Sequence, residues 1–327
     1  MKCLYLCWCL LVSRAWNRFA GARQAAVCLH LRLSKFFCAG MDCQRDRNLQ
    51  EVRLGYGSCL HRRQYARYPE PSGGRSQFHG SGGTSAINGR IAGGDIAIVN
   101  GVVNTLPYYV IGKPIIKSKD DLRGRVAAVH IPGTAADFAL RLALKNVNVP
   151  YNQIKAITIG GGPARIASVI AGQTDFTIVS DAEKIQGERN GLKVIIDMAA
   201  LKVPFVYTCT VTRRQLIREQ PNTVQRMVEA IAAGVHFFKT NKEESIKIMS
   251  KYTRGPSRDI LEGAYAAYSQ MFVEDTYPTL EGLRNTLEVQ SSWDPKAAIA
   301  KAEDFVDLRF VDQLRSSGFV DKLYGRK

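Results

Sequence analysis

The chain has 327 residues, of which 46% are apolar, so it has room for two domains with hydrophobic cores. Its formal net charge is +16, but the basic excess is concentrated in the first 90 residues. The remainder is only mildly basic, so charge alone does not indicate a nucleic-acid or membrane partner. The cysteines form no CxxC pair, which argues against a zinc site built on that motif.

The first 47 residues are expected to be a leader. Lys2 precedes an apolar run, residues 3–12, which resembles a short secretory signal and is too short for a transmembrane helix. Beyond residue 59 the chain has a single cysteine, Cys209, which is compatible with export. We therefore expect a periplasmic or secreted protein, with an unprocessed, unstructured leader as the alternative.

Regular alternation of helix and strand signals begins at Ser81 and predicts an α/β fold. Before it, only residues 51–56 are predicted as a strand, and residues 59–80 show neither a helical nor a strand period. The predicted later strands are 96–99, 126–131, 154–159, 176–179, 194–196 and 205–211. The predicted helices are 84–92, 135–146, 222–240, 242–252 and 257–271.

One helix-strand unit occurs twice. Residues 82–99 and 161–179 each begin with a glycine turn, continue as an apolar helix that stops at a glycine, and end in a buried strand. Ile87 aligns with Ile166, and the stop glycine follows at the same spacing in both copies. Two copies predict two similar α/β lobes, and a cleft between lobes is a common ligand site.

The order and spacing of five segments resemble the substrate-binding proteins of ABC importers in the nitrate/sulfonate/taurine group, which includes thiamine-pyrimidine precursor proteins. The five segments are 52–56, 82–99, 121–134, 162–179 and 212–224. The resemblance extends over residues 48–58 and 81–327. Residues 59–80 depart from the family pattern, which has its first helix and second strand there.

The resemblance implies a two-lobed periplasmic-binding-protein type II fold with the ligand cleft between the lobes. Lobe one would comprise residues 48–117 and 204–327, and lobe two residues 118–203. It implies a protein that is not an enzyme and binds a small anionic, sulfonate-like organic solute by hinge closure. The partner would be an ABC permease in the inner membrane. A monomer without cofactor, metal or nucleic acid is expected.

Binding in such a cleft needs backbone donors at helix N-termini, which suit an anionic group. Three glycine turns supply them, and other polar residues follow the repeated strands, at the edge where open sheets bind ligands. The predicted ligand-binding residues are Gly83, Thr84, Ser85, Gly133, Thr134, Ala135, Gly161, Gly162, Asn100, Gly101 and Asp181. The alternative is that the turns only cap their helices and that Asp181 caps the next helix.

Five other residues have competing interpretations. Arg165, in a first helical turn, is expected to be solvated, with contact to a carboxylate or sulfonate as the alternative. Tyr108 and Tyr207 are expected either to stack on a solute or to pack in the core. His130 is expected to be a buried, hydrogen-bonded histidine, and Cys209 a small core residue.

Two other classes of function remain open. A thiamine-pyrimidine precursor synthesis protein would use a cysteine-rich motif and a histidine, but the cysteines at 3, 7 and 9 lie in the leader. The effector-sensing domain of a transcription regulator would need an N-terminal helix-turn-helix, and residues 59–80 have no helical period. The chain has no P-loop, Gly-x-Ser-x-Gly or His-Glu-x-x-His motif, which disfavours the corresponding enzymes.

Overall fold

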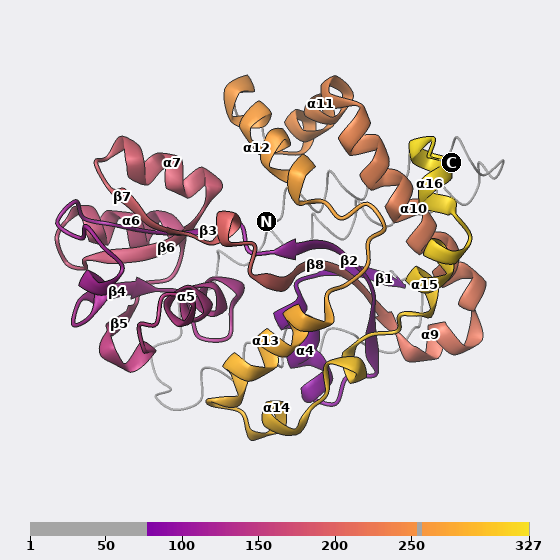
Figure 1. Ribbon diagram of the computed structural model, residues 1–327, viewed down its shortest axis with the longest axis horizontal. Helices are drawn as coiled ribbons and strands as arrows, with labels where there is room; N and C mark the ends of the chain where they lie inside the picture. Colours follow the sequence, from indigo (N-terminus) through magenta and orange to yellow (C-terminus); the bar gives the residue numbers. More distant parts are fainter. Residues whose placement is uncertain (1–76, 254–256, 327) are drawn as a thin grey trace, which may run out of the picture.

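Two β-sheets organise the part of the chain that the computed structural model describes, residues 77–253 and 257–326 (Figure 1). The smaller sheet has the strand order β1-β8-β2, and both pairs are antiparallel. Its strands are β1 (Phe78–Ser81), β2 (Ile96–Thr105) and β8 (Pro204–Arg213). The larger sheet has the order β5-β4-β6-β3-β7 and mixed direction, because β4 runs parallel to β5 and β6 whereas β3 runs antiparallel to β6 and β7. Its strands are β3 (Tyr108–Gly112), β4 (Val126–Val129), β5 (Lys155–Thr158), β6 (Phe176–Ser180) and β7 (Lys193–Asp197).

Helices cover both faces of the three-stranded sheet, because apolar side chains leave β2 in both directions. Ile98 belongs to a core cluster with α4 (Gly83–Ile91), α13 (Leu280–Ser291) and α14 (Pro295–Ile299). Val99 belongs to a cluster on the other face, with four further helices. These are α9 (Arg214–Glu219), α10 (Pro221–Thr240), α15 (Arg309–Ser316) and α16 (Phe319–Tyr324).

The five-stranded sheet is covered in the same way. Ile178 of β6 packs in one cluster with α5 (Ala135–Asn146), and Val179 packs in another with α6 (Gly162–Ile170). Because both faces are buried, β6 is an almost continuous apolar run rather than an alternating one. Helix α7 (Asp181–Arg189) lies beside α6 and also packs on the sheet, where its Gly187 contacts Ile111 of β3.

The remaining helical elements connect these layers. They are η1 (Asp120–Leu122), η2 (Tyr151–Gln153), α8 (Met198–Leu201), α11 (Lys242–Tyr252), α12 (Arg258–Met271) and η3 (Ala302–Phe305). Helices α5, α10, α11 and α12 agree with the predicted helices to within one residue. Among the described residues, no helix combines the length and the apolar character that a membrane span requires.

The α/β fold class and the predicted repeat are both confirmed. The two copies appear as α4–β2 and α6–β6, and the two helices have 9 residues each. Gly82 and Gly161 are the N-caps, and each helix is followed by a left-handed glycine, Gly93 with φ of 93° and Gly172 with φ of 81°. Only glycine adopts that conformation without strain, which explains the shared stop signal.

Two stretches of strand were missed. The strand expected to end at Val99 continues to Thr105, because a bulge between Ile98 and Asn100 lets β2 go on pairing with β8. A strand also forms at Phe78–Ser81, partly within the segment for which no regular element was predicted, because β8 offers it an antiparallel partner. The leader and the strand predicted at 51–56 lie outside the described residues.

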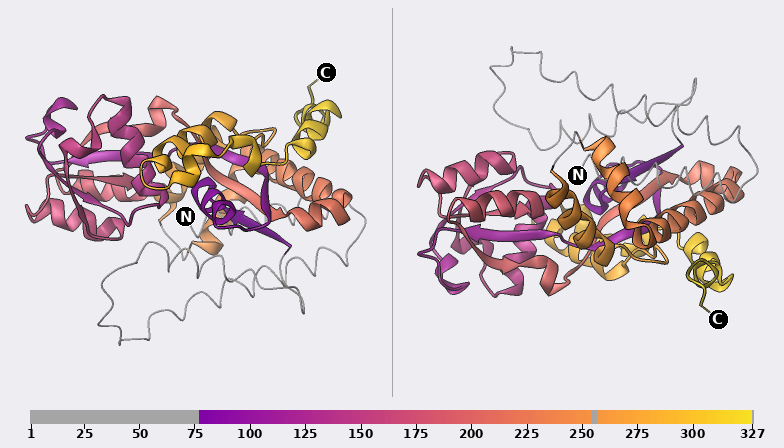
Figure 2. Two further views of the ribbon diagram at one scale, coloured as in Figure 1. Left: turned by 90° about the horizontal axis from the view of Figure 1, so that it is seen from below. Right: turned by 90° about the horizontal axis from the view of Figure 1, so that it is seen from above.

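The chain passes between the two sheets after β2 and again before β8, and Figure 2 shows the five-stranded sheet at one end of the molecule and α16 towards the other. A single core cluster nevertheless contains Phe138 of α5 and Phe205 of β8, whose rings are 6.5 Å apart. The lobe limits stay a prediction. Because β3 pairs in the five-stranded sheet, we propose that the first limit lies near Pro107 rather than at residue 117.

Candidate functional site

Five side chains gather where β4 and β6 end and β3 begins, at the junction of the two sheets. The rings of Tyr108, from β3, and Tyr207, from β8, have centroids 5.9 Å apart and are nearly perpendicular. Burial raises the pKa of Tyr108 to about 12. Arg165 and Glu183 lie close enough to act electrostatically on both Tyr108 and His130. We call these five residues the junction cluster.

Arg165 is buried, so its predicted solvation is wrong. Its side chain is only 2% exposed, and it donates hydrogen bonds to Thr177 Oγ1 at 3.2 Å, to the Ile178 carbonyl at 2.8 Å and to the Gly160 carbonyl. Burial lowers the pKa of the guanidinium. Because the hydrogen bonds to Thr177 and Ile178 join α6 to β6, Arg165 is a structural cation that holds the helix on the strand.

The first turn of α6 faces a carboxylate of the protein. A Cβ atom on Gly162 would lie 1.8 Å from Glu183 Oε1, so this carboxylate lies directly against the turn. The other oxygen, Oε2, accepts hydrogen bonds from Ser180 N at 2.9 Å and from Ser180 Oγ at 3.0 Å, in the capping box of α7. Pro163 supplies no backbone N–H. This turn therefore offers few donors, and a negative charge already stands beside them.

The first turn of α5 is closed by reciprocal capping. Thr134 Oγ1 accepts from Asp137 N at 3.4 Å and donates to the Ile131 carbonyl at 2.8 Å. The Asp137 carboxylate is fully buried, and it accepts from Gly133 N at 3.0 Å and from Arg141 Nε at 3.1 Å. The Thr134 hydroxyl and the Gly133 N–H thus have partners within the helix start.

His130 lies beside this cap. Its Nδ1 is 3.0 Å from Thr134 Oγ1, and the residue is half-buried. Burial, assisted by the positive charge of Arg165, lowers the pKa of the imidazole, so the ring is neutral at pH 7. Since the Thr134 hydroxyl donates its one hydrogen to the Ile131 carbonyl, Nδ1 donates to Thr134 Oγ1, and Nε2 of the neutral ring can accept one hydrogen bond.

The first turn of α4 is different because it has no internal carboxylate. Its N-cap, Gly82, has no side chain, and the first helical hydrogen bond runs from Ala86 N to the Gly82 carbonyl at 3.0 Å. The N–H groups of Gly83, Thr84 and Ser85 have no acceptor within the described part of the chain. These three donors are the ones that an anion at a helix N-terminus would use.

Two further features suit this turn to a ligand. Thr84 is buried, with 3% of its surface exposed. Its hydroxyl lies 3.9 Å from the position of a Cβ on Gly82. This hydroxyl has no hydrogen-bond partner among the described residues. Gly83 packs on β8 so closely that a Cβ would lie 2.4 Å from the Val206 carbonyl oxygen. The next residue of β8 is Tyr207, whose backbone carbonyl oxygen would lie 3.4 Å from a Cβ on Gly82, so the turn of α4 packs on the backbone of β8 at this point.

The residues predicted at the ends of the repeated strands lie elsewhere. Asn100 is fully buried within β2, where its Oδ1 accepts from Thr210 N at 3.1 Å. Gly101 donates to the Thr276 carbonyl at 2.7 Å and allows close approach of Pro278. Asp181 is the first residue of α7, which Ser180 caps. The first turns of α5 and α6 thus lie beside His130 and Glu183 of the junction cluster, whereas Asn100 and Gly101 lie inside the smaller sheet.

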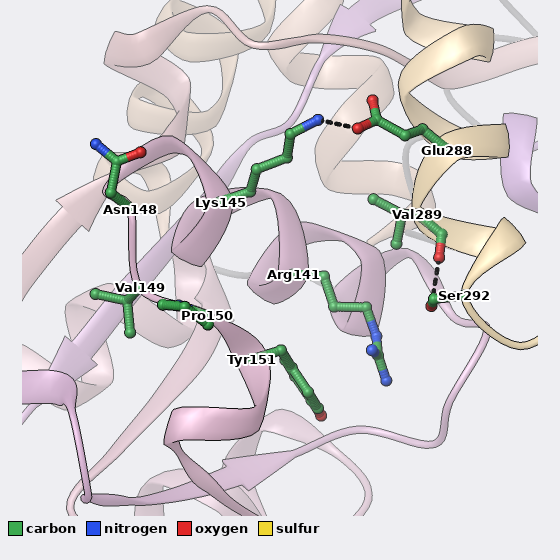
Figure 3. Close-up of a pocket in the computed structure, with 9 residues that line it drawn as sticks. All are labelled: Arg141, Lys145, Asn148, Val149, Pro150, Tyr151, Glu288, Val289 and Ser292. Atoms are coloured by element: carbon green, nitrogen blue, oxygen red, sulfur yellow. Dashed lines mark hydrogen bonds and ion pairs between the residues drawn. The ribbon is translucent and has the colours of Figure 1, made fainter.

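A pocket of about 480 Å³ lies between the C-terminal part of α5 and α13, at some distance from the first turn of α5 (Figure 3). Within it, Lys145 and Glu288 form an ion pair between the two helices, with Nζ and Oε1 2.5 Å apart. The Arg141 guanidinium lies 3.9 Å from the ring centroid of Tyr151 and 4.7 Å from that of Trp293. Sequence reasoning missed this pocket, because its walls come from segments about 140 positions apart.

Cys209 is a core residue, as predicted. It is fully buried in β8, and burial raises the pKa of its thiol above the usual range. A thiol in this state is not a nucleophile. Within the described residues, no three histidine, cysteine, aspartate or glutamate side chains are grouped so as to hold a metal ion.

The fold is that of the two-lobed periplasmic binding proteins. The periplasmic sulfonate-binding protein SsuA from Methylobacillus flagellatus superposes with a TM-score of 0.63, at 16% identity over 81% of this chain and 80% of that chain. The aliphatic sulphonate binding protein SsuA from Escherichia coli gives 0.60, at 17% identity over 71% and 75%. The desulfurization enzyme DszB shares the fold more distantly, with a TM-score of 0.52 and 12% identity over 69% and 80%.

The family follows from the sequence match. The family model described as NMT1/THI5 like matches residues 74–245, more than half of the chain, and the chain belongs to this family. A protein of Brucella abortus named as a binding protein is 25% identical over 149 residues, which make up 44% of this chain and 46% of the relative. The chain therefore spans about half the length of the curated relatives it matches.

Proposed function

We propose that this protein is the solute-binding component of an ABC importer and that it binds a small, sulfonate-like organic anion at the junction of its two sheets. The observation that carries the proposal is the first turn of α4, where three N–H groups and the Thr84 hydroxyl, beside the Tyr207 carbonyl, have no hydrogen-bond partner among the described residues. Similarity to sulfonate-binding proteins supports the same class of ligand.

The chemistry of the turn favours one anionic group. Three convergent N–H donors and a hydroxyl match the oxygen atoms of a sulfonate or carboxylate, and the helix dipole adds a favourable potential. Tyr207 and Tyr108 supply an apolar surface and phenolic hydroxyls for the organic part. Of the predicted ligand residues, Gly83, Thr84 and Ser85 carry this proposal, and Ala135, Gly161 and Gly162 would line the opposite side.

Transport would proceed through lobe closure. A ligand that contacts groups on both sheets binds the closed arrangement better than the open one and therefore shifts the population towards it. The closed protein would then be recognised by a permease in the inner membrane. In this proposal the protein acts in the periplasm, and lobe closure requires neither a catalytic group nor a cofactor.

The test combines a ligand screen with one pair of variants. The full chain is melted in the presence of alkyl sulfonates, taurine, nitrate, pyrimidine precursors and aromatic acids. A ligand at about 100 times its dissociation constant adds about 2.7 kcal/mol to the free energy of unfolding. Hits are then measured by calorimetry with Gly82→Asp and Gly82→Asn. The extended backbone at Gly82 accommodates either cap, because a Cβ there would lie 3.4 Å from the Tyr207 carbonyl oxygen and 3.9 Å from the Thr84 hydroxyl, both ordinary contact distances.

Gly82→Asp places a carboxylate on the free donors, whereas Gly82→Asn places a neutral group of the same shape there. We expect Gly82→Asp to bind an anionic ligand at least about tenfold more weakly than Gly82→Asn, with both variants at least as stable as the parent. Equal affinities of the two variants, or no stabilising ligand in the whole panel, would refute the proposal.

A further inference from the structure

The pocket between α5 and α13 lies apart from the junction of the two sheets and has the dimensions of a binding site (Figure 3). Its volume of about 480 Å³ lies within the range of about 300–1,000 Å³ that is usual for sites of small organic molecules. Helix α5 covers the five-stranded sheet and α13 covers the three-stranded sheet, so a molecule in the pocket contacts helices from both layers. Apolar side chains form much of its walls: Val149, Pro150, Tyr151 and Val289.

Arg141 supplies hydrogen-bond donors at the wall of this pocket. Its guanidinium carbon is 3.9 Å from the ring centroid of Tyr151 and 4.7 Å from that of Trp293, so the two rings hold the group in place. Within the described residues only Nε has acceptors, the two carboxylate oxygens of Asp137, at 3.1 and 3.2 Å. Figure 3 shows the guanidinium between the side chains of Tyr151 and Ser292. Its Nη1 and Nη2 groups can therefore bind a carboxylate in the paired arrangement that arginine favours.

The buried partner of Arg141 offsets its charge without occupying its terminal donors. Asp137 is fully buried and also accepts a hydrogen bond from Gly133 N at 3.0 Å, so its carboxylate is held within the start of α5. Long-range attraction of an anion to Arg141 is therefore small, and the directional bonds from Nη1 and Nη2 supply most of the binding. Hydrogen bonds between ionised groups are about twice as strong as those between neutral ones, so a carboxylate fits these donors better than an alcohol does.

Exposed side chains determine the charge at the rim of the pocket. Lys145 and Glu288 form an ion pair, with Nζ and Oε1 2.5 Å apart, and the side chains of both are more than half exposed. The exposed Arg123 adds a cation nearby, because it donates to the carbonyl of Asn148, a lining residue, at 2.6 Å. Two cations and one carboxylate at the rim favour a ligand with one negative group and disfavour an ammonium group.

We propose that this pocket is a second binding site, which takes a small apolar molecule with one carboxylate group. The carboxylate accepts hydrogen bonds from Nη1 and Nη2 of Arg141, and the apolar body lies against Val149, Pro150 and Val289. The site is separate from the first turn of α4 and does not depend on the solute proposed for the junction. A molecule bound here contacts α5 and α13 together, so it favours the arrangement in which these helices touch.

The experiment uses calorimetry on the full chain with three probes that share one bicyclic apolar body: naphthoate, naphthylmethanol and naphthylmethylamine. Ser292→Asp and its matched control, Ser291→Asp, place the same charge at adjacent positions at the end of α13. Both hydroxyls bond to carbonyls of that helix, but of the two residues only Ser292 lines the pocket. Arg141→Lys keeps a cation near Asp137 and removes the paired donors. Thermal melting establishes that the variants are folded.

The parent and Ser291→Asp should bind naphthoate at least about tenfold more tightly than naphthylmethanol, with naphthylmethylamine weakest. Ser292→Asp should weaken naphthoate at least about fivefold and change naphthylmethanol by about twofold or less, because the new carboxylate competes for the Arg141 donors. Arg141→Lys should reduce the preference for naphthoate over naphthylmethanol to about threefold or less. The inference is wrong if the parent binds no probe or binds all three equally, or if both aspartate variants weaken naphthoate alike.

Discussion

The two copies of the helix-strand unit have the same backbone shape and opposite chemistry. Within the part of the chain that the structure describes, α4 begins with unpaired donors and no acidic group beside them, whereas α6 begins against the carboxylate of Glu183. The shared shape comes from the aligned N-cap glycines, Gly82 and Gly161, and from the buried pair Ile87 and Ile166. These positions determine the backbone shape at the N-cap and the packing of the helix. The other residues of the first helical turn can therefore differ between the two copies.

The residues between those fixed positions account for the difference. Thr84 supplies an N–H and a hydroxyl where the second copy has Pro163, which supplies neither. Ala86 is small where the second copy has the buried Arg165. A repeated fold unit can therefore present different chemical groups at its helix start, because its shape and its chemistry depend on different residues.

The largest effect is expected from removing the cation that only the second copy contains. Arg165→Leu leaves Thr177 Oγ1 and the carbonyls of Ile178 and Gly160 without their donor, so we expect a loss of about 3 kcal/mol in the free energy of unfolding. Urea denaturation measures it. Arg189→Leu, at an exposed position of α7, is the control and should change stability by less than about 0.5 kcal/mol. Similar losses in both variants would contradict the structural role of Arg165.

A smaller loss of stability should distinguish the glycines that begin α4 and α6, Gly83 and Gly162. Gly83→Ala forces a methyl group against the Val206 carbonyl of β8, which cannot move without breaking the sheet, and should cost about 2 kcal/mol. Gly162→Ala meets only the end of the flexible Glu183 side chain and should cost less than about 1 kcal/mol. Chemical denaturation of the pair tests the comparison, and an equal cost would show that the close packing of α4 on β8 is not required.

The smallest effect concerns the aspartate that ends each helix-strand turn. Burial alone would raise the pKa of Asp175, but the hydrogen bond from Val126 N and the ammonium of Lys113 outweigh it and lower the pKa. A carboxyl with a lowered folded pKa stabilises the protein above its unfolded value of 3.8, and the contribution disappears as the pH falls through the folded value. Asp175→Asn should remove about 1 kcal/mol at pH 7 and flatten the decline in acid.

The aligned residue of the first copy provides the control for this pH effect. The side chain of Asp95 is 57% exposed, and its nearest cation, on Arg218, is 3.8 Å away. Asp95→Asn should therefore leave both the stability at pH 7 and its acid dependence nearly unchanged. Parallel acid titrations of the two variants, followed by circular dichroism, make the comparison. If Asp95→Asn alone flattened the dependence of stability on pH, Asp95 rather than Asp175 would be the stabilising carboxylate.

Local signals predicted some elements closely and failed where partners are distant. Helix α5 was predicted with its observed limits, because a Pro-Gly-Thr turn, an apolar period and a following proline all mark it. The strand β2 was cut short because Asn100-Gly101 is a turn signal. Its continuation depends on Thr210 and Thr276, which lie more than 100 positions away.

The site was predicted in part. The glycine turns were found because glycine before an apolar helix is a local signature, but which of them is free depends on Glu183 and on the buried Asp137. The Ser180-x-x-Glu183 spacing is itself a capping-box signature and could have revealed α7. Nothing local indicates that the same carboxylate reaches α6, or that β6 buries Arg165.

The contact of Trp293 with α5 gives the molecule a built-in optical reporter. Its indole is 42% exposed and lies against Phe138, with ring centroids 5.5 Å apart, and beneath the Arg141 guanidinium. Indole emission depends on nearby charge and water, so any movement of α5 relative to the segment after α13 changes its intensity and wavelength. With Trp8 and Trp16 replaced by phenylalanine, the one remaining tryptophan would report movement of α5 relative to this segment in real time, without an attached dye.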